Sequence, residues 1–542
     1  MVTDISLAQR LFGGLRRDIG GLWGALTPSA PPGPGLYTYR VELPGGRRRI
    51  HLRIEGDGAG VLFVDVTDAI HLNPTAAEMA KMALEDVPIE QARGRLLGRY
   101  RGAPGARVDE ELAAIYAMVD GFRRPESGCP TCAVSFLQRA PLFSTRARAP
   151  YKVDLALTYG CNNECPHCYN EPGRLGMASL SKTDWFRVLD RLAEIGVPHI
   201  IFTGGEATLH PDLPDLIRYA DGLGQVTGLN TNGRRLAHRP YMRTLAEAGL
   251  DHVQITLGSS YPEVHDAMMG AASFHQTVRG IHSAFDSGVH AITNTTLMRC
   301  NMDHVEHIVD FLFALGIRTF AMNGMIYSGG GFADPNAIPE HELAPLLVRV
   351  RDHAAALGMR FLWYTPTEYC RMSPVELEIG AKRCNAGEYS MCVEPNGDVL
   401  PCQSYYVSAG NILRDAWERI WQGDLFRSFR EREEDPRWAG LPEKCWECPD
   451  LPLCGGGCRI EREAREGRRV AEGAGGCSGC GGGSMRRESL SATAGFIPSA
   501  GLINTVVRAS GKMAVPVIGL SDIAVRPDFR SLGDFGSLKG EV

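Results

Sequence analysis

Three cysteines in the middle of the chain have the spacing of a metal site. Cys161, Cys165 and Cys168 are separated by three and then by two residues. Thiolates at this spacing can bind three irons of a four-iron cluster, which leaves one iron without a protein ligand. Structural iron–sulfur and zinc sites usually have four protein ligands, so the triad favours an iron on which a small molecule coordinates. A zinc site is the alternative that the spacing alone leaves open.

The flanking sequence supports a cofactor site of this kind. A strand-like apolar run ends at Thr158, His167 places an aromatic ring beside the last cysteine, and Thr203-Gly-Gly-Glu206 follows about one β-α-β unit later. Together these features resemble the radical S-adenosylmethionine (radical SAM) enzymes, in which the amino and carboxylate groups of S-adenosylmethionine bind the open iron. The resemblance implies that a reduced cluster donates one electron to the sulfonium and that the resulting 5′-deoxyadenosyl radical abstracts a hydrogen atom.

The same resemblance implies a set of cofactor-binding residues. The Gly-Gly-Glu motif would hold the amino group, with glycines that let the backbone approach a ligand closely. Polar residues at three later strand ends match positions that contact the ribose and carboxylate, and the residues next to the last cysteine match positions near the adenine and cluster. A cap or turn role is the alternative for the polar strand-end residues. The expected residues are His167, Tyr169, Gly204, Gly205, Glu206, Asn230, Thr256 and Asn294.

A second cysteine array follows Cys370, which the pattern does not place. It contains a Gly397-x4-Cys402 step and a C-x2-C-x5-C-x3-C run from Cys445 to Cys458. These features resemble the SPASM extension of radical SAM enzymes, which carries two auxiliary four-iron clusters. A zinc ribbon is the alternative for the Cys445–Cys458 run.

The resemblance to SPASM implies an interleaved ligation of the two auxiliary clusters. Cys480 could replace Cys477 as the last ligand of the second cluster. Some family members have an aspartate base after the third ligand, but here Gln403 follows, so the acid/base residue is unassigned. Asp398, Tyr405 and Tyr406 are neighbours to test. The implied ligands are Cys384, Cys392, Cys402 and Cys458 for the first cluster, and Cys445, Cys448, Cys454 and Cys477 for the second.

Short apolar strands alternate with amphipathic helices between residues 152 and 365, which predicts parallel β/α units. Six such units match the partial barrel of the radical SAM family, and ligands of such barrels gather at the carboxyl ends of the strands. The predicted helices are 182–195, 214–222 and 241–248. The predicted strands are 153–157, 199–202, 225–230, 252–257, 291–297 and 319–322.

The amino-terminal part predicts a small module of three strands, 37–43, 49–54 and 61–66, followed by three helices. It resembles the PqqD-like peptide-recognition element of pyrroloquinoline-quinone biosynthesis and of many peptide maturases. Such an element captures a leader peptide as an added strand. We expect the leader at the edge of strand 61–66, near Leu112 and Tyr116. A winged-helix accessory domain without a peptide ligand is the alternative.

The expected fold class is therefore α/β: a partial (β/α)6 TIM-type barrel with an amino-terminal winged-helix-like α+β module and a carboxyl-terminal SPASM domain. Cys129 and Cys132 in the linker stay unassigned. The carboxyl-terminal extension is interpreted as a strap on the core, a disordered tail or a fused substrate-like peptide. The expected segments are 1–36 lead-in, 37–121 recognition module, 122–150 linker, 151–366 radical SAM barrel, 367–484 SPASM domain and 485–542 extension.

Composition narrows the class of protein. The 542 residues carry a net charge of −6 with scattered basic residues, which does not favour nucleic-acid binding. No apolar run approaches the ~20 residues of a membrane span, and no signal peptide is recognisable, so a cytoplasmic location is expected. In such a chain the 16 cysteines favour metal over disulfides.

The sequence therefore predicts a peptide maturase that forms a carbon–carbon or thioether crosslink in a ribosomally made peptide. Its partners would be a leader-bearing precursor peptide and a reductant such as flavodoxin or ferredoxin. An enzyme acting on a small molecule, or in metal-cofactor synthesis, is the alternative. A non-enzymatic iron–sulfur scaffold is disfavoured by the open triad and the Gly-Gly-Glu motif.

Overall fold

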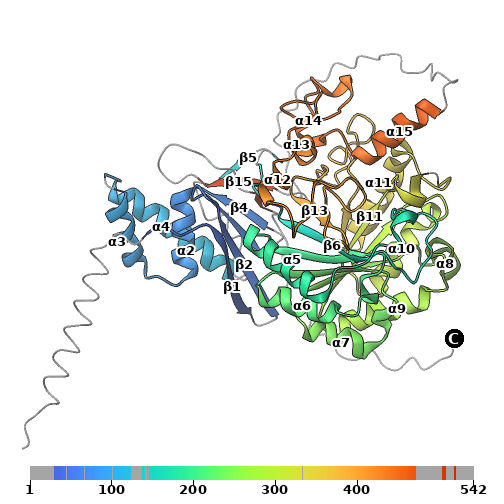
Figure 1. Cartoon of the computed structure of the whole chain (residues 1–542), viewed down its shortest axis with the longest axis horizontal. Coiled ribbons are helices and arrows are strands. Elements are labelled where there is room, and N and C mark those ends of the chain that lie inside the picture. The colour runs from blue at the N-terminus through green and yellow to red at the C-terminus, as the bar shows by residue number, and fades with distance from the viewer. Residues whose placement is uncertain are drawn as a thin grey trace, which may run out of the picture. The chain divides into compact units, whose positions relative to one another are not determined.

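The computed structural model divides into two compact units, which are described separately: residues 1–139 with 505–542, and residues 140–504. Cys129, Cys132, Cys477 and Cys480 lie outside the described residues. The structure describes residues 30–43, 46–65, 68–100, 102–123, 137–140, 143, 146–332, 334–471, 503–507 and 518–519 (Figure 1).

The first unit begins with an antiparallel sheet of four consecutive strands, not the three predicted. The additional strand, β4, forms a hairpin with β3, and its alternation of Ile70 and Leu72 with Ala69 and His71 suits a strand that has two different faces. The sequence prediction assigned no strand between the strand at 61–66 and the first helix. The strands are β1 (Gly35–Leu43), β2 (Gly46–Ile54), β3 (Gly60–Val64) and β4 (Asp68–Leu72).

Three helices follow as predicted, α2 (Pro74–Leu84), α3 (Ile89–Arg99) and α4 (Gly105–Arg123). Asn73 caps α2, because its side-chain oxygen accepts a hydrogen bond of 2.8 Å from the Ala76 amide. Alternate residues of the sheet pack against the helices in one core. This core includes Ile50, Leu52, Leu62, Ile70, Leu112 and Ile115.

The strand order of this sheet corrects the expected docking edge. β3 pairs with β2 on one side and with β4 on the other, so it has no open edge for a leader peptide. The outer edge of β4 pairs in parallel with β15 (Ile503–Val507) from the carboxyl-terminal extension, where Val506 lies opposite His71. β5 (Leu137–Ala140) also pairs with β15, and β16 (Ile518–Gly519) completes the sheet.

The second unit contains a mostly parallel sheet with the order β12-β11-β10-β9-β8-β7-β6-β13-β14. All six predicted strands are present, and β12 is a seventh parallel strand that the sequence prediction missed. The strands are β6 (Lys152–Thr158), β7 (His199–Gly204), β8 (Val226–Thr231), β9 (His252–Thr256), β10 (His290–Thr296), β11 (Thr319–Asn323) and β12 (Arg360–Trp363).

Helices connect these strands and cover one side of the sheet (Figure 1). In α5, a Ser181 cap and a left-handed Gly196 define the two ends. The helices are α5 (Lys182–Ile195), α6 (Leu213–Gly222), α7 (Arg239–Glu247), α8 (Pro262–Met269), α9 (Phe274–Asp286), α10 (Val305–Ala314) and α11 (Glu340–Ala356).

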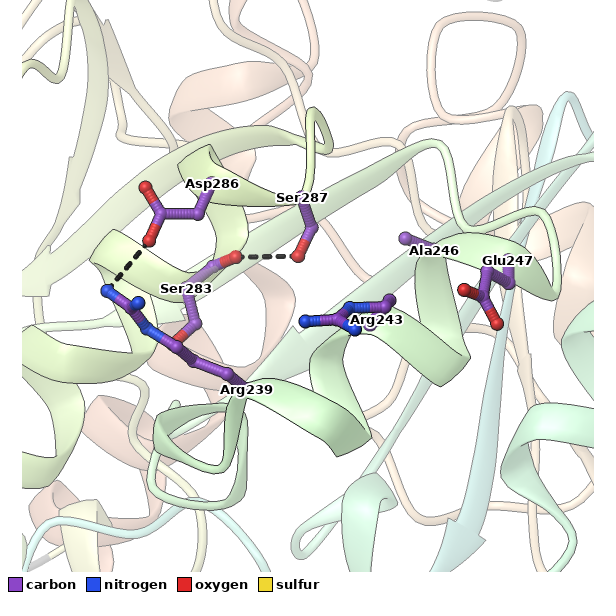
Figure 2. Close-up of a pocket in the computed structure, with 7 residues that line it drawn as sticks. All are labelled: Arg239, Arg243, Ala246, Glu247, Ser283, Asp286 and Ser287. Carbon is purple, nitrogen blue, oxygen red and sulfur yellow. Dashed lines mark hydrogen bonds and ion pairs between the residues drawn. The ribbon is translucent and has the colours of Figure 1, made fainter.

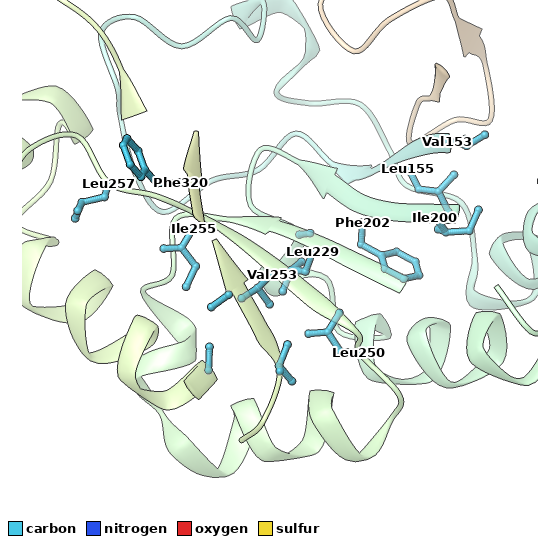
Figure 3. Close-up of a cluster of buried hydrophobic side chains, with 14 of the residues drawn as sticks. Val153, Leu155, Ile200, Phe202, Leu229, Leu250, Val253, Ile255, Leu257 and Phe320 are labelled. Carbon is cyan, nitrogen blue, oxygen red and sulfur yellow. The ribbon is translucent and has the colours of Figure 1, made fainter. Parts of the chain in front are cut away.

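Alternation along the strands gives the sheet two chemically different faces. Leu229, Val253 and Ile255 are fully buried and belong to the core between sheet and helices (Figure 3). Burying such a side chain contributes roughly 1.5–3 kcal/mol relative to leaving it exposed. The residues between them on the same strands are polar, so the opposite face presents hydrogen-bonding groups.

Two strands from the second cysteine array extend this sheet. β13 (Ser390–Val393) pairs in parallel with β6, and β14 (Val399–Leu400) pairs antiparallel with β13. Short helices follow: α12 (Trp417–Trp421), α13 (Asp424–Arg430), α14 (Leu451–Cys454) and α15 (Arg459–Ala471). Among the described residues no helix is long and apolar enough to cross a membrane.

Candidate active site

The first cysteine triad lies in the loop that follows the carboxyl end of β6. The Cys165 thiol donates to the Met269 carbonyl oxygen over 3.5 Å, and the Cys168 amide donates to the Cys165 carbonyl oxygen over 3.1 Å. Burial raises the pKa of Cys165 to about 12, and the neighbouring Cys168 and Cys161 add to this rise. The three thiols are therefore neighbours, as cluster ligands must be.

Glycines of the Gly-Gly-Glu motif pack against the start of this loop. A Cβ atom on Gly204 would lie 2.1 Å from the Thr158 carbonyl oxygen, and one on Gly205 would lie 2.4 Å from that of Tyr159. Gly204 also has a φ of +134°, which favours glycine. The close approach that requires these glycines is thus to the protein's own backbone.

A second glycine run packs on the other side of the loop and was not predicted. Gly329–Phe332 forms a short 3-10 turn in which the Gly330 amide donates to the Cys168 carbonyl oxygen over 2.7 Å. A Cβ atom on Gly330 would lie 2.1 Å from the Pro166 carbonyl oxygen. The run of three glycines from Gly329 was the available sequence signal, but it lies far from the cysteines in the chain.

Glu206 is 1% exposed, and its carboxylate is bound by protein donors. One oxygen accepts from the hydroxyls of Thr208 at 2.6 Å and Thr231 at 2.7 Å, and the other accepts from the Asn232 amide at 2.8 Å. The carboxylate therefore joins the end of β7 to the end of β8. Thr231 and Asn232 were not among the predicted site residues.

The loop after β8 also forms hydrogen bonds with the cysteine loop. The Asn232 side-chain amide donates to the Asn162 side-chain oxygen over 2.7 Å. Arg234 donates to the Asn163 side-chain oxygen over 2.9 Å and to the Gln276 side-chain oxygen over 2.6 Å. Sequence reasoning missed these residues because they act through contacts that no short motif records.

The three predicted strand-end residues share the polar face of the sheet. Asn230 lies opposite Gln254 in the register of β8 and β9, and Thr256 lies opposite Asn294 in that of β9 and β10. The Asn294 side-chain oxygen is buried and accepts no hydrogen bond within the described part of the chain. A buried acceptor without a donor fits a ligand that supplies one. Gln254 is an additional polar residue of this row.

His167, next to the last cysteine of the triad, is a second buried polar residue of the candidate site. Burial lowers the pKa of His167, although nearby Asp334 opposes the shift, so the ring is neutral at physiological pH. Its buried Nδ1 atom has no hydrogen-bond partner among the described residues. Burial raises the pKa of Tyr169, and the Cys168 thiol adds to that rise.

Tyr406 packs against the buried cluster that contains Cys392 and also hydrogen-bonds the loop of the first triad. Its hydroxyl donates to the Asn170 side-chain oxygen over 3.0 Å, and Asn170 donates to the Gly204 carbonyl oxygen over 3.3 Å. The Arg174 guanidinium lies 4.2 Å from the centre of the Tyr406 ring. Of the three acid/base candidates, Tyr406 hydrogen-bonds the triad loop, whereas Asp398 accepts from Asn411 and the Tyr405 hydroxyl bonds Glu463.

The cysteines expected for the first auxiliary cluster are electrostatic neighbours. Burial raises the pKa of Cys402 to about 12, and Cys384 is the next cause. Burial also raises the pKa of Cys458, with contributions from Cys384 and Cys402. Cys392 lies on β13. Burial is the main cause that raises its pKa, followed by Asp154 and then by Cys402. The four thiols therefore occupy one region, as their predicted role requires.

The cysteines expected for the second auxiliary cluster lie in and around α14. Cys454 is the last residue of α14, and Gly455, Gly456 and Gly457 after it have φ values of +61°, +76° and +70°. Three consecutive left-handed residues turn the chain sharply between Cys454 and Cys458. Adjacent cysteines of the motif can thus serve different clusters.

Cys445 and Cys448 lie before α14, where the Cys448 amide donates to the Cys445 carbonyl oxygen over 3.3 Å. Burial raises the pKa of Cys445 to about 11, and Cys454 and Cys370 are among its charged neighbours. Cys370, which the sequence did not place, is therefore near this group. Cys477 and Cys480 lie outside the described residues.

A surface hollow is lined by none of these groups. It has a volume of about 460 Å³ between α7 and α9 (Figure 2). Arg239 and Asp286 form an ion pair of 2.9 Å across it. None of its lining residues is a predicted site residue, so it plays no part in the proposed chemistry.

Among the described residues no three histidine, cysteine or acidic side chains converge on the position of a single metal ion. Ligands of a four-iron cluster bind different irons, so they surround a volume and do not meet at one point. The neighbouring thiols, the glycine contacts that fix their loop and the unpaired polar atoms beside them fit an iron–sulfur cluster with a bound cofactor.

Comparison with known proteins agrees with these features. A model of the radical SAM superfamily matches residues 155–312, and a model of the SPASM iron–sulfur cluster-binding domain matches residues 384–449. The crystal structure of Streptococcus suis SuiB has a similar fold, with a TM-score of 0.55 and 18% identity, over 78% of this chain and 96% of SuiB.

Two curated relatives cover the same region. A mycofactocin maturase, MftC, of Mycobacterium tuberculosis is 29% identical over 322 residues, which are 57% of this chain and 78% of the maturase. A PqqA peptide cyclase of Streptomyces rochei is 31% identical over 323 residues, which are 58% of this chain and 85% of the cyclase. With this identity across most of the cyclase, the chain belongs to the radical SAM superfamily, as a member that carries a SPASM iron–sulfur domain.

Proposed function

We propose that this radical SAM/SPASM enzyme abstracts a hydrogen atom from a ribosomally made peptide and forms a carbon–carbon or thioether crosslink. The observation that carries the proposal is the contact chain from Gly204 through Asn170 to Tyr406. Tyr406 also packs against the buried cluster that contains Cys392, so the chain connects the loop of the open triad to the auxiliary cysteines, which supports one reaction centre for both sets of thiols.

The cofactors are S-adenosylmethionine and [4Fe-4S] clusters. One cluster would be held by the triad and two by the SPASM cysteines. When bound and reduced, they supply a 5′-deoxyadenosyl radical that removes one hydrogen atom from the substrate. Cys161, Cys165 and Cys168 would hold the first cluster. The unpaired atoms of His167 and Asn294, with Asn230 and Thr256, would bind the nucleoside and amino-acid parts of S-adenosylmethionine.

The chain's own residues position this chemistry. Glu206 acts through Thr231 and Asn232, because its carboxylate is already satisfied by them. Asn232 and Arg234 then hold the two asparagines between the first two cysteines. The side chain of Glu206 thus positions the loop. The backbone of the Gly-Gly-Glu motif, and not the Glu206 carboxylate, would contact the amino group of S-adenosylmethionine.

The names of the relatives support a peptide substrate. The cyclase acts on the PqqA peptide, the mycofactocin protein is a maturase, and SuiB has been crystallised with the precursor peptide SuiA. The sheet and three helices of the first unit support a PqqD-like recognition module for a leader peptide. The remaining segment boundaries and a flavodoxin or ferredoxin reductant belong to the same proposal.

The test uses anaerobically reconstituted enzyme with each small peptide encoded beside its gene. Each crosslink removes two hydrogens from the peptide. We therefore expect mass spectrometry to show a product that is lighter by about 2 Da for each crosslink. A variant with Cys161, Cys165 and Cys168 replaced by Ala should lose S-adenosylmethionine cleavage and keep about eight irons. Cleavage by that variant would contradict the assignment of the triad.

A further inference from the structure

We propose that Cys370 supplies the fourth thiolate of the second auxiliary cluster, beside Cys445, Cys448 and Cys454. Family resemblance assigns this place to Cys477, and nothing in the sequence pattern gives a role to Cys370. The assignment rests on the proposed function, under which a cluster is bound at these cysteines. Three sets of contacts place Cys370 there.

The first set joins the Cys370 loop directly to a predicted ligand. The Tyr369 amide donates to the Cys454 sulfur over 3.3 Å, and the Cys454 thiol lies 3.6 Å from the Thr367 carbonyl oxygen. The residue immediately before Cys370 thus hydrogen-bonds a ligand sulfur. Backbone amides that donate to sulfur are common around iron–sulfur clusters and tune their potential.

The second set involves Lys444, the neighbour of Cys445. Its ammonium group lies 2.6 Å from the Glu368 carboxylate and 3.6 Å from the Cys370 sulfur. The cation therefore bridges the loop of Cys370 and the segment of Cys445.

The third set fixes the Cys370 loop in place. Glu368 is 5% exposed, forms an ion pair with Arg465, and its amide donates to the buried Glu340 carboxylate over 3.3 Å. A Cβ atom on Gly457 would lie 3.0 Å from the Glu368 amide nitrogen. The loop is therefore tied both to α11 and to the glycine turn that follows Cys454. A ligand on such a rigid loop needs little ordering when it binds a cluster.

Cys300 provides the contrast that makes this placement informative. Like Cys370, it is an exposed free cysteine of the same unit. Burial raises the pKa of Cys300, and its only charged neighbour in that shift is Asp334, with no cysteine involved. Exposure does not argue against Cys370 as a ligand, because Cys161 of the open triad is exposed as well.

The experiment compares reconstituted full-length variants by iron content and by electron paramagnetic resonance and Mössbauer spectra. Cys370→Ala should lose about four of about twelve irons, or convert the second auxiliary cluster to a three-iron form with its own spectrum. Cys370→Ser, which keeps an oxygen ligand, should retain more iron and shift the spectrum of that cluster only. Cys454→Ala is the reference for loss of the same cluster, and Cys300→Ala is the matched control.

The double variant Cys477→Ala/Cys480→Ala separates the two assignments. If Cys370 is the ligand, this variant keeps the iron content and spectra of the wild type. The proposal is overturned if the double variant loses the cluster while Cys370→Ala matches Cys300→Ala. If Cys454→Ala also loses no iron, the auxiliary-cluster assignment itself has failed, which is a distinct result.

Discussion

At the scale of single residues, the site depends on hydrogen bonds that cross between distant segments. Tyr406 is the clearest case, because its hydroxyl reaches Asn170 in the triad loop while its ring packs under Arg174. Arg174 in turn forms an ion pair with Glu394, which also accepts from the Tyr159 hydroxyl over 2.7 Å. One network therefore fixes both sides of the first triad.

Removing the Tyr406 hydroxyl should weaken cofactor binding without removing any cluster. Tyr406→Phe loses the 3.0 Å bond to Asn170, which orients Gly204. A hydrogen bond of this kind contributes about 1 kcal/mol net, so S-adenosylmethionine should bind about five-fold more weakly in calorimetric titrations of reconstituted enzyme. Tyr405→Phe is the control, because that hydroxyl meets Glu463 away from the loop. Equal affinities for both variants would contradict the role of Tyr406.

Some residues of the candidate site have a local sequence signal, and others have none. The cysteine triad has a local signal, because cluster ligands need fixed spacing, and its role as the ligand set stays a prediction. Glu206 had a local signal in the Gly-Gly-Glu motif, but its donors Thr231, at the end of β8, and Asn232, just after it, had none. Asn232 and Arg234 had no local signal at all, because their function arises from contacts formed only in the folded chain.

At the scale of elements, glycines hold the cysteine loop between two turns. Gly204 and Gly205 pack closely against the backbone at the start of the loop, and Gly330 packs against the backbone in its middle. β6 and β7 are neighbouring parallel strands, so Gly204 and Gly205 lie beside the start of the loop, whereas Gly330 comes from the turn after β11. The loop thus has a backbone conformation that is set by its neighbours before any cluster binds.

A methyl group at position 330 should displace the cysteine loop. Gly330→Ala places a Cβ atom 2.1 Å from the Pro166 carbonyl oxygen, where no flexible side chain can yield. We expect a loss of about 1–3 kcal/mol in unfolding free energy and incomplete filling of the first cluster, measured by thermal unfolding and by iron content. Gly176→Ala is the control, since nothing lies within 4 Å of its added atom. A fully loaded Gly330→Ala enzyme with unchanged Tm would refute the packing argument.

The alternation of apolar residues predicted the six strands of the parallel sheet and the three amino-terminal helices. It assigned no element to the residues of β4 (Asp68–Leu72) and β12 (Arg360–Trp363). It also placed an open edge at β3, since sequence patterns show which residues form a strand but not which strands become its neighbours. The pairing of β4 with β15 links residues more than four hundred positions apart, which no local pattern contains.

That pairing gives a direct test of the carboxyl-terminal extension. Val506→Pro removes the backbone donor of the residue opposite His71, and proline is poorly tolerated between paired strands. Hydrogen–deuterium exchange in the full-length enzyme should therefore quicken in Asp68–Leu72 and stay unchanged in β6. Unaltered exchange in β4 would mean that β15 does not protect this edge.

At the scale of the whole molecule, the chemistry and the proposed recognition belong to different units. Every residue proposed to bind S-adenosylmethionine lies between 161 and 294, within the second unit. The first unit contributes a sheet and three helices with their own core, and no proposed cofactor ligand. Cofactor cleavage and choice of peptide should therefore be separable by mutation.

Deleting residues 30–123 should separate the two functions. The truncated enzyme should still cleave S-adenosylmethionine without substrate, because the triad and the polar strand ends remain. It should modify a leader-bearing peptide at least ten-fold more slowly, since strand addition that supplies about 1.4 kcal/mol or more of binding is lost. Product formation is measured for both enzymes, on the peptide with and without its leader. The leaderless peptide is the internal control, because it should react equally with both. Equal modification of the leader-bearing peptide, by a truncated enzyme with about twelve irons, would show that the first unit does not select the substrate.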